Sequence, residues 1–315
     1  SHLPYYALRT TMRMFAALVC SLLFTFTYAT WAAKSRRAGM ILVPVLDILQ
    51  SVPILGFLSF TVVFFMGLFP GRVLGAELAA IFAIFTSQAW NMAFSLYQSL
   101  TTLPADLDEA ARAFRLSPWQ RFWRLEVPFA VPGLVWNTML SMSGGWFFVV
   151  ASEAVSVGNT TWKLPGIGSY VALALERRDI GAVFEAIGAM LVVILLYDQL
   201  LFRPLVAWSA KFRFEVVAGE GADDPWLLAL LRRTQLLRAA SDAMGGVFFW
   251  VSGMRLAGAR AAREHPRWRS RAADLAWLAV LAAAIALAAA RIVGFVAGAL
   301  HWHDVFTALI DGCFT

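Results

Sequence analysis

Carboxylates in apolar surroundings are the residues of this sequence that could most readily do chemistry. Asp47, Glu185 and Asp198 lie in or near long apolar runs. A carboxylate at membrane depth is costly, so it often lines a polar path or relays protons. A place near a helix end would instead give it a structural role, and Asp47 lies near a predicted helix start. Asp47, Gln50 and Glu153 are the candidate pathway residues, although Glu153 suits a structural partner better than a ligand.

Motifs for hydrolysis or metal binding are absent from the sequence. No GxxxxGK[ST], HExxH or GxSxG pattern occurs. His301 and His303 would not share a helix face, and no third ligand is near them. Cys20 and Cys313 form no disulfide framework or CxxC pattern. We therefore expect no catalytic activity, no metal site and no cofactor bound by this chain.

The composition indicates a membrane protein. The chain is 60% hydrophobic and 15% charged, with a mean hydropathy of +0.68, whereas a soluble domain carries roughly a quarter charged residues. The net charge of +6 is typical of basic cytoplasmic loops and is not a nucleic-acid signal in this setting.

Six apolar runs are long enough to cross a bilayer, which takes about 20 residues. They cover residues 14–33, 40–69, 78–100, 129–151, 182–205 and 272–300. Pro53 lies in the second run, so we expect a short helix joined to a spanning helix there. The predicted fold class is an all-α polytopic membrane protein with about six transmembrane helices in this sequence.

The basic loops orient these spans. With the first loop inside, alternation places three loops inside, at residues 34–38, 101–128 and 206–271. These carry three, four and eleven Lys or Arg, against one and three in the two outside loops. This agrees with the positive-inside rule. Arg9 and Arg13 would lie outside, and they are the exception to the pattern.

The loop at 101–128 contains two helix-start signals. Pro104 and the acidic residues after it favour a helix that runs to about Phe114. Ser117, with Pro118 after it and a Gln three positions on, forms a capping box for a second helix. That helix should end before Pro128, because proline disfavours helix at the preceding residue.

Large apolar side chains gather at the turn between these two helices: Phe114, Leu116, Trp119, Phe122 and Trp123. Exposed aromatic residues are typical of a surface that a partner protein covers. The same residues could instead form an aromatic belt at the membrane interface. The residues alone leave both interpretations open.

This loop resembles the EAA loop of the inner-membrane components of binding-protein-dependent ABC importers. The resemblance rests on Glu109-Ala110-Ala111, Ser117, Gln120, Phe122, Leu125, Pro128 and Pro132-Gly133. In that family the loop is a coupling helix that docks on an ATP-hydrolysing subunit. The implied coupling residues here are Glu109, Ala110, Ala111, Arg115, Ser117, Trp119, Gln120, Phe122 and Pro128.

Arg115 departs from the family pattern, which has glycine at this position. Glycine suits a left-handed helix end, where another residue costs about 1 kcal/mol. Either the turn is built differently here, or this chain docks its ATPase less well.

The resemblance covers about residues 10–210. Residues 44–58, and 151–153 with 166–168, resemble the nitrate/sulfonate/bicarbonate-type branch. The resemblance implies a MetI-like permease of the bacterial inner membrane, with ATP used only by a partner. Its partners would be ATPase subunits, a periplasmic or surface substrate-binding protein, a second permease copy (fused or separate) and membrane lipid, but no nucleic acid.

Two other classes of function stay open from the residues. An ion-coupled secondary transporter would use Asp47, Glu185 or Asp198 and would depend on an ion gradient rather than on ATP. A membrane enzyme is the third class, although no catalytic cluster supports it.

The chain divides into three parts at the level of composition. Residues 1–212 form a permease domain that is expected to lack its first helix. Residues 213–270 form a basic cytoplasmic linker with amphipathic helices, one of them over 226–239. Residues 271–315 are expected to be the first transmembrane helix of a second permease copy.

Overall fold

The computed structural model describes residues 3–209 except 53, 71, 158 and 159, and isolated positions beyond them, mainly within 275–294. It contains two compact units, Ser1–Ala259 and Arg260–Thr315. The apolar helix Leu275–Arg291 belongs to the second unit, within the predicted span 272–300. The predicted helix over 226–239 and the two histidines lie outside the described residues.

The first unit is built from helices, as predicted. Its helices are α1 (Leu3–Lys34), α2 (Arg36–Ser51), α3 (Ile54–Leu68), α4 (Val73–Thr101), α5 (Ala105–Ala113), α6 (Pro118–Arg121), α7 (Val127–Glu153), α8 (Ile167–Glu176), α9 (Ile180–Tyr197) and α10 (Arg203–Ser209). Two π-helical turns, η1 (Phe122–Glu126) and η2 (Asp198–Phe202), connect α6 to α7 and α9 to α10.

Four continuous helices of this unit are long and apolar enough to span a membrane. They cover Leu3–Lys34, Val73–Thr101, Pro118–Glu153 and Ile180–Ser209. The predicted span 40–69 instead divides into α2 and α3, of 16 and 15 residues. The break lies at Val52, the C-cap residue directly before Pro53, where the proline was expected to interrupt the helix.

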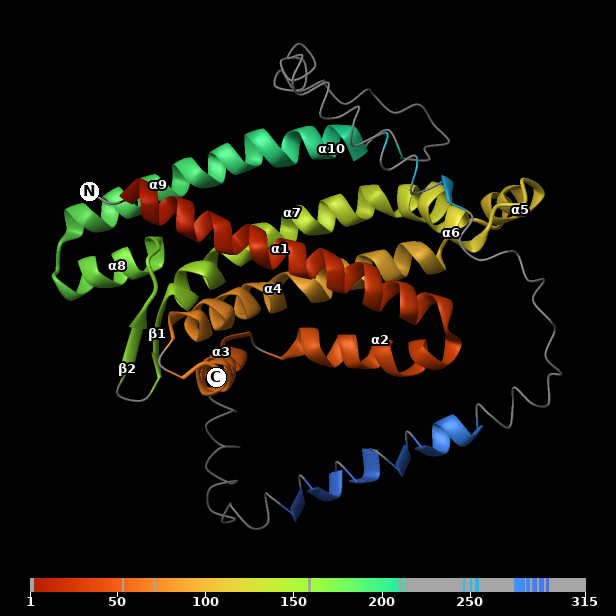
Figure 1. The fold of residues 1–315 in the computed structure, drawn as a ribbon, viewed down its shortest axis with the longest axis horizontal. Coiled ribbons are helices and arrows are strands. Elements are labelled where there is room, and N and C mark those ends of the chain that lie inside the picture. The colour runs from red at the N-terminus through yellow and green to blue at the C-terminus, as the bar shows by residue number, and fades with distance from the viewer. Residues whose placement is uncertain are drawn as a thin grey trace, which may run out of the picture. The chain divides into compact units, whose positions relative to one another are not determined.

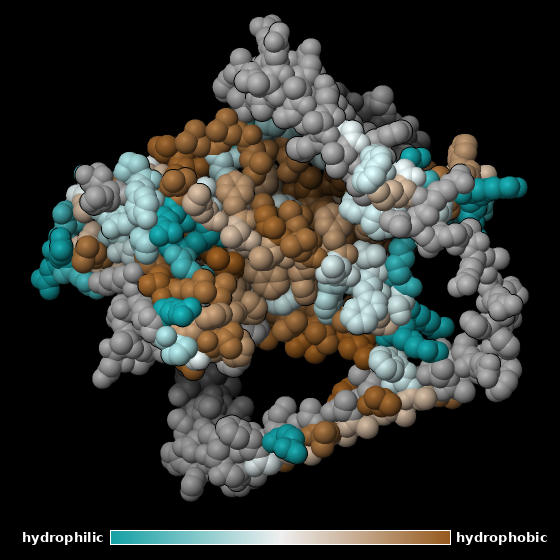
Figure 2. All heavy atoms as spheres, in the orientation of Figure 1, coloured by the Kyte–Doolittle hydropathy of each residue, from teal (hydrophilic) through white to brown (hydrophobic). Residues whose placement is uncertain are grey.

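The core lies between α1, α4 and α7 (Figure 1). Met14, Ile84, Met92, Met142 and Val149 come from these three helices, and all are fully or almost fully buried. Figure 2 shows hydrophobic side chains over the middle of the bundle and hydrophilic ones at its two ends, over α5 and α8. This banding suits a bundle that crosses a bilayer.

A short hairpin and α8 lie together at one end of α7, and α5 and α6 lie at the other (Figure 1). Strands β1 (Ala154–Val157) and β2 (Thr160–Lys163) pair antiparallel, with Ala154 opposite Lys163. This hairpin was not predicted. We call the two ends of the bundle the Glu126 end and the Glu153 end, after the residues that flank α7.

The helix does not end before Pro128, and that prediction was wrong. It continues from α6 through η1 into α7. In an α-helix the Pro128 ring would clash with the carbonyl of Arg124. The π-turn widens the helix just before the proline, and the Val127 N–H donates to the Phe122 carbonyl five residues back. The turn η2 precedes Pro204 in the same way.

Candidate functional site

The corner between α5 and α6 is a Schellman motif. The Leu116 N–H donates to the Ala111 carbonyl over 3.1 Å, and the Arg115 N–H donates to the Arg112 carbonyl over 2.9 Å. Arg115 has a φ of 50°, the left-handed conformation that this motif needs at the residue after the helix. The turn is therefore built as it would be with glycine, although an arginine is present.

The predicted capping box starts α6. Ser117 Oγ accepts from the Gln120 N–H at 3.3 Å, and Gln120 Oε1 accepts from the Ser117 N–H at 3.1 Å. Both residues are buried. The Gln120 side-chain amide also donates to the Gly253 carbonyl over 3.1 Å. Ser117 and Gln120 thus fix the direction of α6 and tie it to a residue far along the chain.

The end of α5 and the corner after it are exposed at residues 109, 110 and 112–115, and we call Glu109, Ala110, Phe114 and Arg115 the tip of the loop. The Phe114 side chain is 79% exposed, which is costly for an aromatic ring unless another molecule covers it. Ala111 is buried behind the tip. Glu109 and Ala110 therefore share one accessible surface, and Ala111 packs on the other side of α5.

The other aromatic residues of the loop lie against α1. Trp119, Phe122 and Trp123 line a groove of about 560 Å³, together with Phe26, Thr27, Thr30, Lys34 and Pro118. Trp119 and Trp123 meet edge to face, with ring centroids 5.7 Å apart. The structure thus separates the predicted cluster into Phe114 at the exposed tip and three rings on the α1 side.

Ion pairs tie the loop to the bundle at the Glu126 end. Glu126 is 3% exposed and binds the Lys34 ammonium through both of its carboxylate oxygens. Arg121 Nε lies 3.0 Å from Glu126, and Arg121 Nη1 lies 2.7 Å from Asp108 Oδ1. Because Asp108 belongs to α5 and Lys34 to α1, this network links both helices to the start of α7.

A second polar network lies at the Glu153 end. Arg13 is buried and binds Glu77 through two hydrogen bonds, of 2.6 and 2.8 Å. Its Nη1 also donates to Glu153 at 2.7 Å. Glu153 accepts from Thr10 Oγ1 at 2.6 Å and from the Gly168 N–H at 2.7 Å. The carboxylate of α7 thus caps the N-terminus of α8, which favours negative charge.

Two glycines allow α8 to approach Glu153 and the end of α7 closely. A Cβ on Gly166 would lie 2.2 Å from the Glu153 carboxyl carbon, and one on Gly168 would lie 2.2 Å from the Val150 carbonyl oxygen. A side chain at Gly168 would collide with backbone, and one at Gly166 would displace the Glu153 carboxylate from its hydrogen bonds. The sequence paired these two segments only by resemblance, and the structure places them in direct contact.

Comparison with known proteins decides the family. Residues 21–203, which are 183 of the 315, match the model of the binding-protein-dependent transport system inner membrane component. The chain belongs to this family. The glycine betaine/carnitine transport permease protein GbuB of Listeria monocytogenes is 31% identical over 176 residues, which cover 54% of this chain and 55% of GbuB.

Two further relatives come from different transport systems. The glycine betaine/proline betaine permease ProW of Escherichia coli K12 is 27% identical, over 60% of this chain and 50% of ProW. The bicarbonate permease CmpB of Synechocystis is 26% identical, over 38% of this chain and 41% of CmpB. The chain spans about half the length of the first of these relatives. The permease family is confirmed, and the relatives include betaine permeases beside the bicarbonate branch.

The candidate pathway residues of the permease lie in two separate places. Asp47 and Gln50 are exposed near the end of α2, joined by a 3.3 Å hydrogen bond from the amide to the carboxylate. Asp47 is therefore not near a helix start, because α2 already begins at Arg36. Glu153 is fully buried in its own network and does not join them.

Sequence reasoning missed the partners that hold both networks together. Lys34 and Glu126 are 92 residues apart, and Arg13 and Glu77 are 64 apart. One signal was available: a charge inside or beside an apolar run needs an opposite charge. Arg13 stood out as the exception to the loop orientation, and its burial with two carboxylates explains how it is accommodated.

Proposed function

We propose that this permease forms part of the translocation pathway of an ATP-driven importer, and that the loop at 101–128 couples it to a separate ATPase subunit. The observation that carries the proposal is the exposed tip of Glu109, Ala110, Phe114 and Arg115. The tip rests on a capped corner, and ion pairs anchor that corner to α1 and α7.

Such a tip can transmit motion because its base is fixed. Asp108 binds Arg121, which binds Glu126, and Glu126 also binds Lys34. A displacement of α5 therefore acts directly on the start of α7. The 27-residue α7 extends about 40 Å at 1.5 Å per residue, and it ends at Glu153 beside α8. The Glu126 end would face the cytoplasm, in agreement with the positive-inside rule.

The pathway is proposed to pass α2, where Asp47 and Gln50 are exposed. Asp47 lies 11 residues after the first residue of α2, about 16 Å along the helix. A charged side chain at that depth normally faces a polar cavity or another protein. The relatives are named for betaines and for bicarbonate, so we expect a small charged or zwitterionic solute, delivered by an external binding protein.

The test is co-purification of the tagged full-length protein from its native host in mild detergent, combined with uptake measurements. We expect an ATPase subunit to accompany the permease, and Glu109→Lys to release it and abolish ATP-dependent uptake. Arg177→Glu is the matched control, since it reverses an exposed charge next to the C-terminus of α8. It should leave the ATPase bound.

Two results would contradict the proposal. One is unchanged ATPase binding and uptake in the Glu109→Lys protein. The other is uptake that follows an ion gradient and continues without ATP, which would point to the secondary transporter.

A further inference from the structure

Three aromatic side chains of the loop at 101–128 lie on α1 rather than at the exposed tip. Trp119, Phe122 and Trp123 form one wall of the groove of about 560 Å³ described above, which we call the Trp119 groove. The other wall is a stripe of α1 that runs from Phe26 to Lys34. The proposed ATPase contact uses the tip and leaves this groove without a role.

The Trp119 groove extends from the level of the lipid headgroups into the hydrocarbon region. Lys34 is the last residue of α1, and Trp31 in the same last turn is 63% exposed. An exposed tryptophan near a helix end is typical of the membrane interface. Phe26 precedes Lys34 by about two turns, which places it about 12 Å deeper along the helix. A molecule in the groove would therefore have a polar part beside Lys34 and an apolar part beside Phe26.

Two hydrogen-bond donors lie at the headgroup end of the groove. The Lys34 side chain is 46% exposed, and its ammonium donates to both carboxylate oxygens of Glu126. An ammonium has three N–H donors, so one is left for a phosphate oxygen. The buried Thr30 hydroxyl lies one turn before Lys34 and has no hydrogen-bond partner among the described residues. It can donate to a phosphate or ester oxygen in the groove.

The charge around the groove favours a negatively charged headgroup. The two segments beside it that are predicted to be cytoplasmic, 34–38 and 101–128, carry seven Lys or Arg against four Asp or Glu. Arg36 is exposed at the start of α2, and two residues of chain place it no more than about 7 Å from Lys34. Each basic residue near the membrane surface strengthens the binding of anionic lipid about fivefold.

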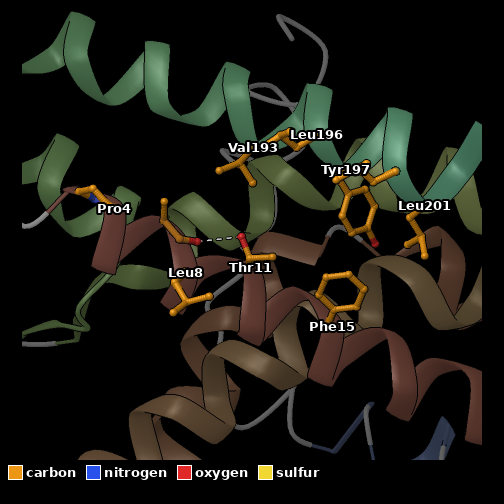
Figure 3. A pocket seen from close by; sticks show the side chains of 10 residues that line it. Pro4, Leu8, Thr11, Phe15, Val193, Leu196, Tyr197 and Leu201 are labelled. Carbon is orange, nitrogen blue, oxygen red and sulfur yellow. Dashed lines mark hydrogen bonds between the residues drawn. The ribbon is translucent and has the colours of Figure 1, made fainter. Parts of the chain in front are cut away.

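A second groove along α1 lacks this charge. It lies between α1 and α9 and also measures about 560 Å³ (Figure 3). Phe15 and Tyr197 contribute to its walls, with ring centroids 5.2 Å apart, and none of the residues that line it is charged. Asp198, next to Tyr197, pairs with Arg203, so the two together add no net charge. This groove should accept an acyl chain without selecting a headgroup.

We propose that the Trp119 groove binds one anionic phospholipid of the cytoplasmic leaflet, with its phosphate at Lys34 and an acyl chain against Phe26 and Trp123. These two rings stack with centroids 6.3 Å apart and offer a continuous apolar surface. The bound lipid lies between α1 and the base of the loop at 101–128. The inference goes beyond the proposed function, because lipid binding at this groove does not require the ATPase.

The experiment places a photo-crosslinking benzoylphenylalanine at position 119 of the full-length permease, purified with its partners and held in nanodiscs of phosphatidylglycerol and phosphatidylcholine in equal amounts. The substitution keeps an aromatic ring in the groove wall. Position 15, in the groove between α1 and α9, is the matched control. Mass spectrometry identifies the lipid adducts. We expect phosphatidylglycerol adducts to exceed phosphatidylcholine adducts about fivefold or more at position 119, and the two to be about equal at position 15.

Two variants test the headgroup contact. Lys34→Gln and Arg36→Gln should each lower the phosphatidylglycerol excess at position 119 about twofold or more, whereas Arg177→Gln, beside the C-terminus of α8, should leave it unchanged. Arg36 is not part of the Glu126 network, so its variant keeps the test valid if Lys34→Gln loosens the fold.

Three results would overturn the inference: equal adducts of the two lipids at position 119, an excess that both variants leave unchanged, or crosslinks from position 119 to protein instead of lipid. If the lipid excess is found but no ATPase accompanies the permease, only the proposed function fails.

Discussion

The two π-turns of the permease, η1 and η2, have the same construction but different surroundings. Each precedes a proline and joins opposite charges five residues apart, Arg121 with Glu126 and Asp198 with Arg203. In an α-helix such residues would lie about 140° apart around the axis. At η1 the carboxylate is 3% exposed and Lys34 binds it as well. At η2 both charged side chains are roughly half exposed.

The difference lies in what covers each pair. The pair at η1 is an internal joint, because α1 and α5 both contribute charges to it. At η2 no third charged side chain of the described residues joins the Asp198–Arg203 pair. Removing one partner of a buried ion pair is strongly destabilising because it leaves an unpaired buried charge, whereas an exposed pair contributes little to stability. The first pair should therefore contribute more to the stability of the folded chain than the second.

The largest expected effect is at Glu126. Lys34→Gln and Arg121→Gln should each lower the free energy of unfolding by about 1 kcal/mol, since one cation remains beside Glu126. The double variant should lose about 3–5 kcal/mol, because a buried carboxylate is left unpaired. Unfolding by SDS in mixed micelles measures the free energy lost in the single variants and in the double variant.

The control for this prediction is Glu126→Gln added to the double variant, which should recover most of the loss because the unpaired charge is gone. Losses that simply add between the two single variants would contradict the shared network. They would also remove the contrast between the two π-turns.

The loop was the part of the permease that its sequence predicted best. Local hydrogen bonds decide its shape, so the Ser117–Gln120 capping box and the end of α5 at Phe114 could be read from short patterns. The π-turn at η1 was missed because Pro128 was expected to end the helix, and the one at η2 was missed because the predicted span 182–205 ran through Pro204 without any change in hydrogen bonding. Pro128 and Pro204 instead shift the hydrogen bonding by one residue and let the helix continue.

Contacts between distant residues could not be derived in the same way. The pairing of Arg13 with Glu77 and Glu153 depends on how α1, α4 and α7 pack, and no local pattern encodes that packing. The hairpin at 154–163 had a weak signal, since both strands contain β-branched residues. The burial of Glu153 depends on the hairpin and α8, so its hydrogen-bond partners could not be predicted from the sequence either.

A smaller effect is expected at the tip, where the backbone rather than a charge network is strained. Arg115→Gly should raise the free energy of unfolding by about 1 kcal/mol, since a left-handed conformation is unfavourable for arginine. Arg178 ends α8 in the same way, with a φ of 55°, so Arg178→Gly is the matched control. Equal increases in the free energy of unfolding for both variants would show that the strain at Arg115 comes from its left-handed backbone alone. A loss of stability in Arg115→Gly would mean that its side chain supports the η1 network.

The smallest effect on stability is expected at η2. Asp198→Asn and Arg203→Gln should each change the free energy of unfolding of the purified chain by about 0.2–1 kcal/mol, the range for exposed pairs. Their effects should add, because no third charged group of the described residues depends on them. The swap Asp198→Arg with Arg203→Asp should be tolerated equally well, as the pair keeps its attraction. A loss as large as that of the Lys34 and Arg121 double variant would show that the chain itself covers η2, and the two π-turns would then be equivalent joints of a single domain.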